Sequence, residues 1–226
     1  MEFVRSKKGI SVSQRKYTID LWNETGMLDS KPSKTPIDLK DKRKMFEGNP
    51  VDKERYQQLV GKLIYLSHTI PNIAFAVSLV SQYMHDPCQG HLNAVYRILR
   101  YLKQTPGKGL FFIKTTERKV EVFVDADSAR SVDDRKPTSG YCTIVWGNVV
   151  IWRSKKQTVV GRSIAEAEYR ASSISIAHNP IHHDRTKHVE VDRHFIKEKI
   201  DGGIVSIKYV HMDQQLADIL TKGLSE

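Results

Sequence analysis

The chain has 226 residues, of which 39% are hydrophobic and 27% charged, and a formal net charge of +10 at pH 7. This length can bury a sizeable core in one large or two small domains. No apolar run approaches the ~20 residues that span a bilayer, and no signal-peptide core follows Met1, so the sequence argues against membrane and secreted classes. Cys88 and Cys142 fall in different predicted regions, which favours a reduced intracellular chain over a disulfide scaffold.

The positive charge is concentrated in the first half of the chain. Residues 1–110 carry 18 basic and 10 acidic side chains, a net charge of +8, whereas residues 111–226 carry 18 and 16, a net charge of +2. A basic half beside a nearly balanced one is typical of a nucleic-acid platform joined to a carboxylate-bearing domain. A solvated basic surface explains the same pattern, and charge alone does not separate the two interpretations.

The first fifty residues predict one helix and one extended segment. Residues 1–13 show no strong period. Residues 14–25 have an apolar helical face and end at Gly26, a glycine suited to a helix C-terminus. That face consists of Tyr17, Leu21 and Trp22. Residues 31–50 are rich in Lys, Asp and Pro, which predicts a linker or an extended strap.

Three helices are predicted between residues 52 and 105. Asp52 can cap the first, Pro71 suits the start of the second, and Pro106 and Gly107 end the third. Apolar residues recur at helical spacing in each, which indicates core packing rather than a cofactor site. The expected inward residues are Tyr56, Leu59, Val60, Leu63 and Ile64, then Ile73, Ala76, Val77, Val80 and Met84, and then Leu92, Val95, Ile98, Leu99 and Leu102.

The third of these helices also carries basic residues. Arg97, Arg100 and Lys103 are spaced so that they can follow a phosphate backbone. Solvated surface charge is the simpler explanation of the same three residues.

Acidic residues follow β-type patterns in the second half. Residues 120–127 alternate charged and apolar side chains and then reach two acids, which predicts a strand with carboxylates at its C-terminal end. Residues 141–145 and 149–152 predict a hairpin through the tight turn 146–148. Residues 165–171 have a helical composition and carry an acid towards the sheet. Acids on a strand and on the next helix suit a divalent cation held by oxygen ligands.

Six ordered motifs in this half resemble the C-terminal ribonuclease H region of copia-type LTR retrotransposon Pol polyproteins. They are VFVDADSA (122–129), VDDRKPTSGY (132–141), WRSKKQ (152–157), AEAEYRA (165–171), RTKHVEVDRHFIKEKI (185–200) and QQLADILTKGL (214–224). Six matches in order over about a hundred residues are far more specific than any one of them. The chain is therefore identified as a member of this family.

The resemblance extends over nearly the whole chain. Residues 61–87 and 91–110 resemble the segment that connects the reverse transcriptase to ribonuclease H, and residues 10–38 resemble the end of the reverse transcriptase. By this resemblance Ile10–Ser13 is the remnant of a strand, and Ser13 is the cap of the helix that follows. The Tyr-x-Asp-Asp hairpin of the polymerase site is absent from the sequence, so no polymerase activity is expected.

The resemblance implies an α/β (α+β) fold, with a helical connection region followed by a ribonuclease H-like mixed sheet and flanking helices. It divides the chain into residues 1–50, the reverse transcriptase remnant and linker, residues 51–110, the connection region, and residues 111–226, the ribonuclease H-like domain. The expected product is a C-terminal fragment of the polyprotein.

The family's site holds two Mg²⁺ ions by four acids, which activate a water and neutralise the leaving oxygen when the RNA strand of a hybrid is cut. Asp125 matches the first acid, Glu168 the second and Asp218 the fourth. Glu166 is the weaker alternative to Glu168, because two residues of a helix point to different sides. Asp127 is the near neighbour of Asp125 on the same face of a strand.

The third acid of the family has no counterpart in this sequence. In the family a long helix and then a strand with a Cys-Asp-Asn element follow the second acid, whereas here residues 171–175 run directly into sequence that resembles the segment after that strand. The resemblance thus implies an internal deletion near 171–175 that removes most of one helix and one central strand. The five histidines between 178 and 194 match no closed tetrahedral zinc pattern.

Three functional hypotheses remain open, and whether the chain is an enzyme is one of the open points. The first is a Mg²⁺-dependent endonuclease on RNA–DNA hybrids, impaired or inactive because of the missing acid and strand. The second is a non-catalytic protein that binds nucleic acid through the basic half, and the third is a decayed fragment without a selected function. The expected location is intracellular, either cytoplasmic, in virus-like particles as in the family, or nuclear, with no membrane partner.

Overall fold

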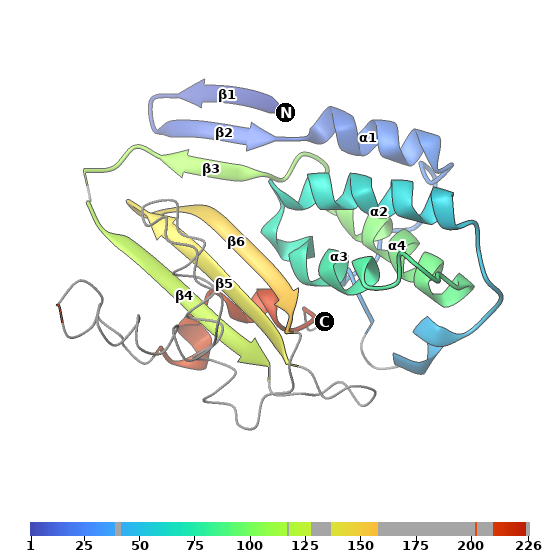
Figure 1. The fold of residues 1–226 in the computed structure, drawn as a ribbon. Coiled ribbons are helices and arrows are strands. Elements are labelled where there is room, and N and C mark those ends of the chain that lie inside the picture. The colour runs from blue at the N-terminus through green and yellow to red at the C-terminus, as the bar shows by residue number, and fades with distance from the viewer. Residues whose placement is uncertain (39–41, 117, 128–136, 158–201, 203–209, 225–226) are drawn as a thin grey trace. The chain divides into compact units, whose positions relative to one another are not determined.

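A computed structural model of the protein describes residues 1–38, 42–116, 118–127, 137–157, 202 and 210–224 (Figure 1). These residues form four α-helices and two three-stranded sheets, which confirms the predicted α+β class. The chain divides into two compact units. The first contains Met1–Lys119, Val145–Val149 and Lys222–Glu226, and the second contains Val120–Ile144 and Val150–Thr221.

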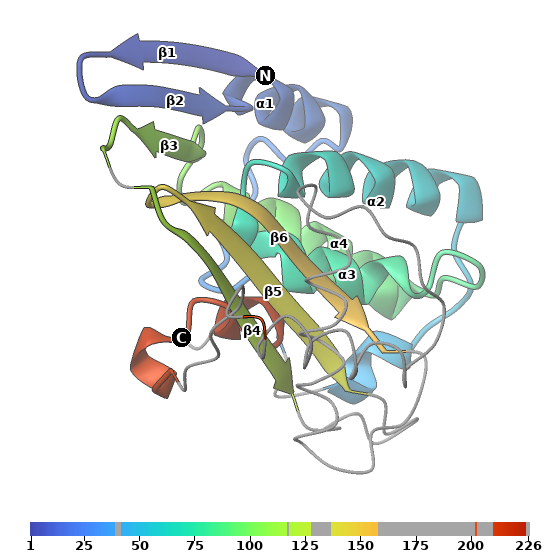
Figure 2. The ribbon, with the colours of Figure 1, turned by 60° about the vertical axis from the view of Figure 1, so that its left-hand side comes forward.

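The first unit begins with a sheet that the sequence pattern did not reveal in full. Strands β1 (Glu2–Ser6) and β2 (Gly9–Ser13) form an antiparallel hairpin, and β3 (Leu110–Ile113) pairs with the other edge of β2 (Figure 2). Every residue of β1 is exposed. Gly9 lies opposite Ile113, and a Cβ atom at Gly9 would lie 2.0 Å from the Phe112 carbonyl oxygen, so the pairing of β2 with β3 requires glycine there.

Helix α1 (Arg15–Glu24) follows the hairpin, and Gln14 rather than Ser13 is its N-cap residue. The predicted Ser13 cap is therefore wrong. The Gln14 side chain does not cap the helix either, because its Nε2 donates to the Tyr65 carbonyl and to Thr69 Oγ1, both at 3.1 Å. Tertiary hydrogen bonds to the end of the next helix thus take precedence over a local cap. The predicted end at Gly26 is confirmed by its positive φ of 66°.

The predicted three helices are confirmed as α2 (Lys53–Ser67), α3 (Ala74–Ser81), which follows the 3₁₀ turn η2 (Pro71–Ile73), and α4 (Gln89–Leu102). Asp52 caps α2, since its carboxylate accepts from the backbone N–H groups of Glu54 at 3.0 Å and Arg55 at 3.2 Å. Among the described residues, no helix is long and apolar enough to cross a membrane.

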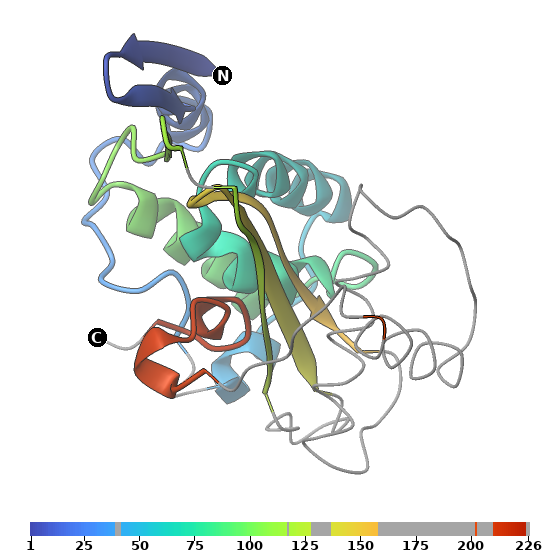
Figure 3. The ribbon, with the colours of Figure 1, turned by 90° about the vertical axis from the view of Figure 1, so that its left-hand side faces the viewer.

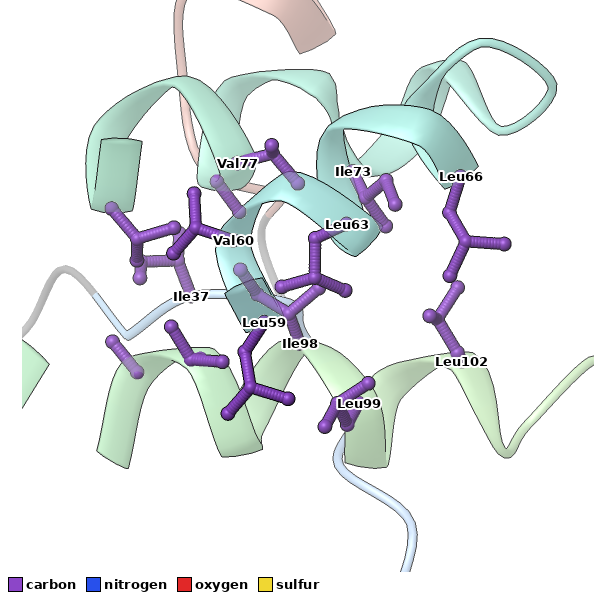
Figure 4. Close-up of a cluster of buried hydrophobic side chains, with 14 of the residues drawn as sticks. Ile37, Leu59, Val60, Leu63, Leu66, Ile73, Val77, Ile98, Leu99 and Leu102 are labelled. Carbon is purple, nitrogen blue, oxygen red and sulfur yellow. The ribbon is translucent and has the colours of Figure 1, made fainter. Parts of the chain in front are cut away.

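The core of the first unit lies between these helices. Figure 4 shows Leu59 and Leu63 of α2 pointing towards Ile98 and Leu99 of α4. Burial of such side chains contributes about 1.5–3 kcal/mol each. Two polar side-chain atoms that enter this core donate to carbonyls: Trp22 Nε1 to the Leu99 oxygen at 3.0 Å and Tyr56 Oη to the Val80 oxygen at 2.8 Å.

One predicted core residue of α2 is exposed. Ile64 was expected in the apolar stripe, but 37% of its surface remains accessible, whereas the neighbouring Leu63 is fully buried. Successive helical residues are rotated by about 100° around the axis, and the stripe of α2 faces α3 and α4 at Leu63.

The described residues of this segment, 31–38 and 42–50, form a strap over α4 rather than a free linker. The Ser33 N–H donates to the Arg100 carbonyl at 3.2 Å, Thr35 and Ile37 are buried, and the 3₁₀ turn η1 (Lys42–Phe46) packs against α4. Gly90 allows this approach, because a Cβ there would lie 2.2 Å from the Lys44 carbonyl oxygen. Of the two predicted alternatives, the structure therefore shows the strap.

The second unit is built on the antiparallel sheet β4 (Val120–Asp127), β5 (Thr138–Val145) and β6 (Asn148–Lys156), in the order β4-β5-β6. The predicted turn between β5 and β6 is confirmed, with φ of 52° at Trp146 and 73° at Gly147. Positive φ at both central residues is the mark of a type I′ turn, whose twist matches that of the strands. Within the described part of the chain, β4 is an edge strand.

Candidate functional site

Asp125 lies in the C-terminal half of β4, where the sequence predicted a carboxylate. Ala126 is buried, and Asp125 and Asp127 on either side of it are half-buried. Alternation along the strand places both acids on the face opposite to that of Ala126. The buried alanine anchors this end of β4 in the second unit and leaves the two carboxylates at its partly accessible surface.

The Asp125 carboxylate is held by a residue near the end of the chain. Thr221 Oγ1 donates a hydrogen bond to Asp125 Oδ2, and Thr221 is only 1% exposed. The same Oγ1 lies 3.1 Å from the carbonyl oxygen of Asp218. A hydroxyl has one proton, so the two acceptors share it. Thr221 thus links two of the three predicted acidic positions, although it was not singled out in the sequence.

Asp218 opens the 3₁₀ turn η4 (Asp218–Leu220), which contacts β4 (Figure 3). The turn can approach the sheet because residue 140 of β5 is glycine. A Cβ atom at Gly140 would lie 2.7 Å from Leu220 Cβ and 2.8 Å from Thr221 Cγ2. Gly140 is thus a strand residue with a packing role.

A second link between β4 and the C-terminal segment runs through Gln215. Its Nε2 donates to the Val124 carbonyl at 3.0 Å, and its Oε1 accepts from the Ala217 N–H at 3.2 Å. Val124 directly precedes Asp125, so this amide satisfies one backbone acceptor of the edge strand beside the carboxylate. Gln215 and Thr221 together fix the approach of η4 to β4.

Glu168, the remaining predicted site residue, lies outside the described residues, as do Glu166, the deletion near 171–175 and the histidines between 178 and 194. Among the described residues, no three His, Cys, Asp or Glu side chains form a group that could hold a metal ion. The acidic side chains described near η4, Asp125 and Asp218, would offer carboxylate oxygens to a metal ion. Burial raises the pKa of Cys142 in β5 to about 11, so its thiol is protonated at neutral pH.

Arg97 of α4 and Lys103 at its C-terminal end have structural partners that neither sequence interpretation included. Arg97 donates to the Thr35 carbonyl at 3.2 Å and to Thr35 Oγ1 at 2.9 Å, and its guanidinium lies 3.4 Å from Asp38 Oδ2. Lys103 donates to the carbonyls of residues 27 and 28 and lies 5.5 Å from the centre of the Trp22 ring. Both cations therefore hold the N-terminal segments on α4.

Comparison with known proteins covers the whole chain. It is 36% identical to the retrovirus-related Pol polyprotein from transposon RE2 of Arabidopsis thaliana, over all of this chain and 18% of that polyprotein. It is 31% identical to the corresponding polyprotein from transposon TNT 1-94 of Nicotiana tabacum, over 96% of this chain and 19% of the relative. The uncharacterized mitochondrial protein AtMg00810 of Arabidopsis thaliana is 38% identical over 75% of this chain and 70% of its own.

No family model and no solved structure matches the chain. It spans less than a fifth of the length of the RE2 polyprotein. The alignment with RE2 extends over 259 positions and includes all 226 residues of the chain, so at least 33 positions of the alignment have no residue of this chain.

Proposed function

The chain belongs to the copia-type retrovirus-related Pol polyproteins of transposons, and on that premise we propose that its second unit is a ribonuclease H-like module with an incomplete site. The activity from which it descends is Mg²⁺-dependent cleavage of the RNA strand of RNA–DNA hybrids. In this chain that activity is weak or lost.

One observation carries the proposal: the Asp125 carboxylate on β4 and the Asp218 turn meet through a single buried hydroxyl, that of Thr221. These acids are 93 residues apart in the chain, and both are positions where the family motifs carry acids. Gly140, Gln215 and Thr221 all serve to bring the two segments together. The contact at Asp218 is made through its backbone carbonyl, and the role proposed for its carboxylate rests on the family motif.

The donor chemistry suits a hard divalent cation. Asp125 and Asp218 offer carboxylate oxygens, the ligands that Mg²⁺ prefers, and together with Glu168 they would hold the ion. When bound, Mg²⁺ would activate a water and neutralise charge on the cleaved phosphate. Thr221 orients the Asp125 carboxylate, and it also occupies one lone pair that is then less available to a cation.

We expect cleavage to be impaired because a segment that is present in the aligned relative is missing from this chain. At least 33 aligned positions have no counterpart here, and the motif pattern assigns the third acid and its strand to that missing part. Three carboxylates hold two dications less well than four, and catalysis suffers more than affinity because it depends on the geometry of both ions.

The test combines cleavage and metal binding on the purified 226-residue chain. An RNA–DNA hybrid oligonucleotide is incubated with Mg²⁺ or Mn²⁺, and the melting temperature is recorded with and without Mn²⁺. We expect slow or absent cleavage and a rise in melting temperature with Mn²⁺ that Asp125→Asn abolishes. The matched control is Asp29→Asn, which neutralises an exposed acid in the first unit and leaves the Mn²⁺ response unchanged.

Two results would contradict the proposal. One is a Mn²⁺ response that is the same in wild type and Asp125→Asn, whether or not the hybrid is cut. The other is rapid hybrid cleavage by the wild-type chain, which would show that the site is complete and that the missing segment is dispensable.

A second candidate function rests on the first unit. Arg5, Lys7 and Lys8 are exposed on the β1–β2 hairpin, where no packing requires them. A non-catalytic protein that binds nucleic acid through this surface would bind single- and double-stranded oligonucleotides with an affinity that falls steeply with salt. Replacing Lys7 and Lys8 with glutamine would then weaken binding of all sequences alike, as measured by fluorescence anisotropy at two salt concentrations.

A further inference from the structure

The two outer strands of the sheet β1-β2-β3 differ in how their outer edges are closed. At β3, the Ile113 N–H donates to Asn148 Oδ1, and Asn148 Nδ2 donates to the Ile113 carbonyl at 3.1 Å. This one side chain makes both hydrogen bonds that a further strand would make there. At β1, all five residues are exposed, and the described residues include no strand on its outer side (Figure 1).

Phe3 and Arg5 direct their backbone hydrogen-bonding groups to this outer edge. The Lys114 N–H donates to the Lys8 carbonyl at 3.0 Å, so the backbone of Lys8 faces β3. These groups alternate sides along a strand, so the odd-numbered residues of β2 face β1, where they pair with its even-numbered residues. The two odd-numbered residues of β1 therefore carry N–H and C=O groups that point outwards, and another strand can pair with them.

The side chains of β1 do little to keep another strand away. Edge strands are usually protected by proline, lysine or a bulge. β1 contains neither of these residues and pairs with β2 in an unbroken register. Phe3 and Val4 are 66% and 65% exposed. The Glu2 carboxylate accepts from the Lys16 N–H at 2.8 Å and is therefore committed to the start of α1. What remains is an apolar edge with one cation, Arg5, near its end.

We propose that β1 pairs with β1 of a second copy of the chain, as antiparallel strands around a two-fold axis at Val4. Full overlap of the two five-residue strands places Val4 opposite Val4, Phe3 opposite Arg5 and Glu2 opposite Ser6 of the other copy. Phe3 and Arg5 are the residues with outward backbone groups, so each pair of them exchanges two hydrogen bonds. The result is one six-stranded sheet with three strands from each copy.

The sequence of β1 is complementary to itself in this register. Each Arg5 guanidinium lies beside the exposed ring of Phe3 of the other copy, a cation–π pair that occurs twice. Val4 lies on the same face of the sheet as Phe111 and Ile113, which are 49% and 54% exposed, so the Val4 pair joins two apolar faces. A shift of two residues places Arg5 opposite Arg5, and like charges opposed across strands are destabilising. The strand therefore favours a copy of itself as its partner.

The expected dimer is weak and closes at two copies. A five-residue pair is about 17 Å long, and its contact area is below that of standard interfaces. Each copy has a net charge of +10, so repulsion opposes association and added salt should strengthen it. Nucleic-acid binding by the same hairpin would respond to salt in the opposite direction. Because Asn148 closes the β3 edge, the sheet should not grow further.

The experiment is sedimentation equilibrium of the full 226-residue chain from dilute to concentrated solution. We expect the average mass to rise towards that of a dimer, and the dimer fraction to increase with salt. Val4→Lys should remain a monomer at every concentration, because two ammonium groups face each other at the two-fold axis. Val4→Thr keeps a neutral β-branched side chain and should dimerise as wild type does.

A charge exchange at Val4 tests the register and guards against misfolded variants. Val4→Glu alone should also be monomeric, whereas an equimolar mixture of Val4→Lys and Val4→Glu should form the dimer again, because opposite charges then face each other. Phe111→Lys is the matched control, since it puts the same charge on the same face two strands away. It should dimerise as wild type does. Asp125→Asn should dimerise too, because the inference does not depend on the ribonuclease H-like proposal.

Three results would overturn the proposal. The first is a wild-type chain that stays monomeric at every concentration, including one that instead binds an unrelated extended peptide at this edge. The second is a mixture of the two charged Val4 variants that fails to dimerise. The third is association that Phe111→Lys abolishes and Val4→Lys does not, or that continues beyond the dimer, since face-to-face packing or pairing at β3 would then be responsible.

Discussion

At the scale of single residues, the Thr221 hydroxyl connects the C-terminal turn to the Asp125 carboxylate. We expect Thr221→Val, which keeps the shape and removes the donor, to lower the free energy of unfolding by about 1–3 kcal/mol, because a half-buried carboxylate loses its hydrogen bond. Urea unfolding followed by circular dichroism measures the change.

Thr221→Ser is the matched control, since it retains the hydroxyl and removes only a methyl group. Its loss of stability should be clearly smaller than that of the valine variant. Equal losses would mean that packing of the methyl group, and not the hydrogen bond, matters at this position.

His91 is a second buried polar group with a role of its own. Its Nδ1 accepts from the Cys88 N–H at 3.0 Å as part of a capping box at the start of α4, and its ring stacks on Tyr83 with 4.0 Å between ring centres. Burial lowers the pKa of His91 below its usual 6.5, and the nearby Asp86 opposes this in part. The fold therefore accommodates the neutral imidazole.

This lowered pKa predicts a loss of stability in mild acid. The unfolded chain takes up the proton at a higher pH than the folded chain does, so the contribution of His91 is complete above pH 6.5 and is lost as the pH falls below it. We expect the free energy of unfolding to decrease over this window in wild type and in His85→Gln, which alters an exposed histidine. In His91→Gln this part of the pH dependence should be missing, and its persistence would assign the effect to other groups.

At the scale of elements, two glycines in different surroundings give a paired prediction. Gly140→Ala should destabilise the protein by about 1–3 kcal/mol, because its Cβ would lie 2.7 Å from Leu220 Cβ and push η4 away from the sheet. Gly61→Ala in α2 should stabilise it by about 0.4–1 kcal/mol, since no atom lies within 4 Å of the new methyl group. Thermal unfolding of wild type and the two variants measures the loss and the gain of stability. A Gly140→Ala variant as stable as wild type would contradict the close packing of η4 on β5.

The elements that the sequence predicted well are those with strong local patterns. Local signals marked these elements: the Asp52 cap for α2, Pro71 for the start of the turn before α3, and the β5–β6 turn for the hairpin. Each signal acts on its immediate neighbours in the chain, so local sequence was enough to predict the element. The β1–β2–β3 sheet did not, because β3 lies about a hundred residues from β2 and β1 is exposed on both faces, without alternation. The strand position of Gly140 and the strap contacts of Arg97 likewise depend on distant partners that no local pattern encodes.

At the scale of the whole molecule, the large helical core belongs to the first unit alone. Leu63→Ala should cost about 2–5 kcal/mol there, because Leu63 is fully buried. We expect hydrogen exchange to accelerate in peptides from α2 and α4 and to stay unchanged in peptides from β5. Ile64→Ala, one residue away but exposed, should change exchange little, and equal effects of the two substitutions would contradict the observed face of α2.

The candidate site was only partly within reach of the sequence. The motif pattern predicts Asp125 and Asp218 as site residues, and their role stays a prediction. The structure shows that Thr221 Oγ1 contacts the Asp125 carboxylate and the Asp218 backbone carbonyl. Thr221 and Gln215 were missed because a hydroxyl and an amide are common surface residues, and only the fold makes them partners of β4. Glu168 lies beyond the described residues and stays a prediction.

The attachment of the strap to α4 also bears on how the protein would respond to salt. Binding of a polyanion releases condensed counterions, and each neutralised phosphate adds about 0.9 to the slope of log affinity against log salt concentration. Arg97 is paired with Asp38, and Lys103 donates to backbone carbonyls of its own chain, so both cations are less available to a phosphate backbone. The measured slope should therefore be smaller than a count of basic residues in the first half implies.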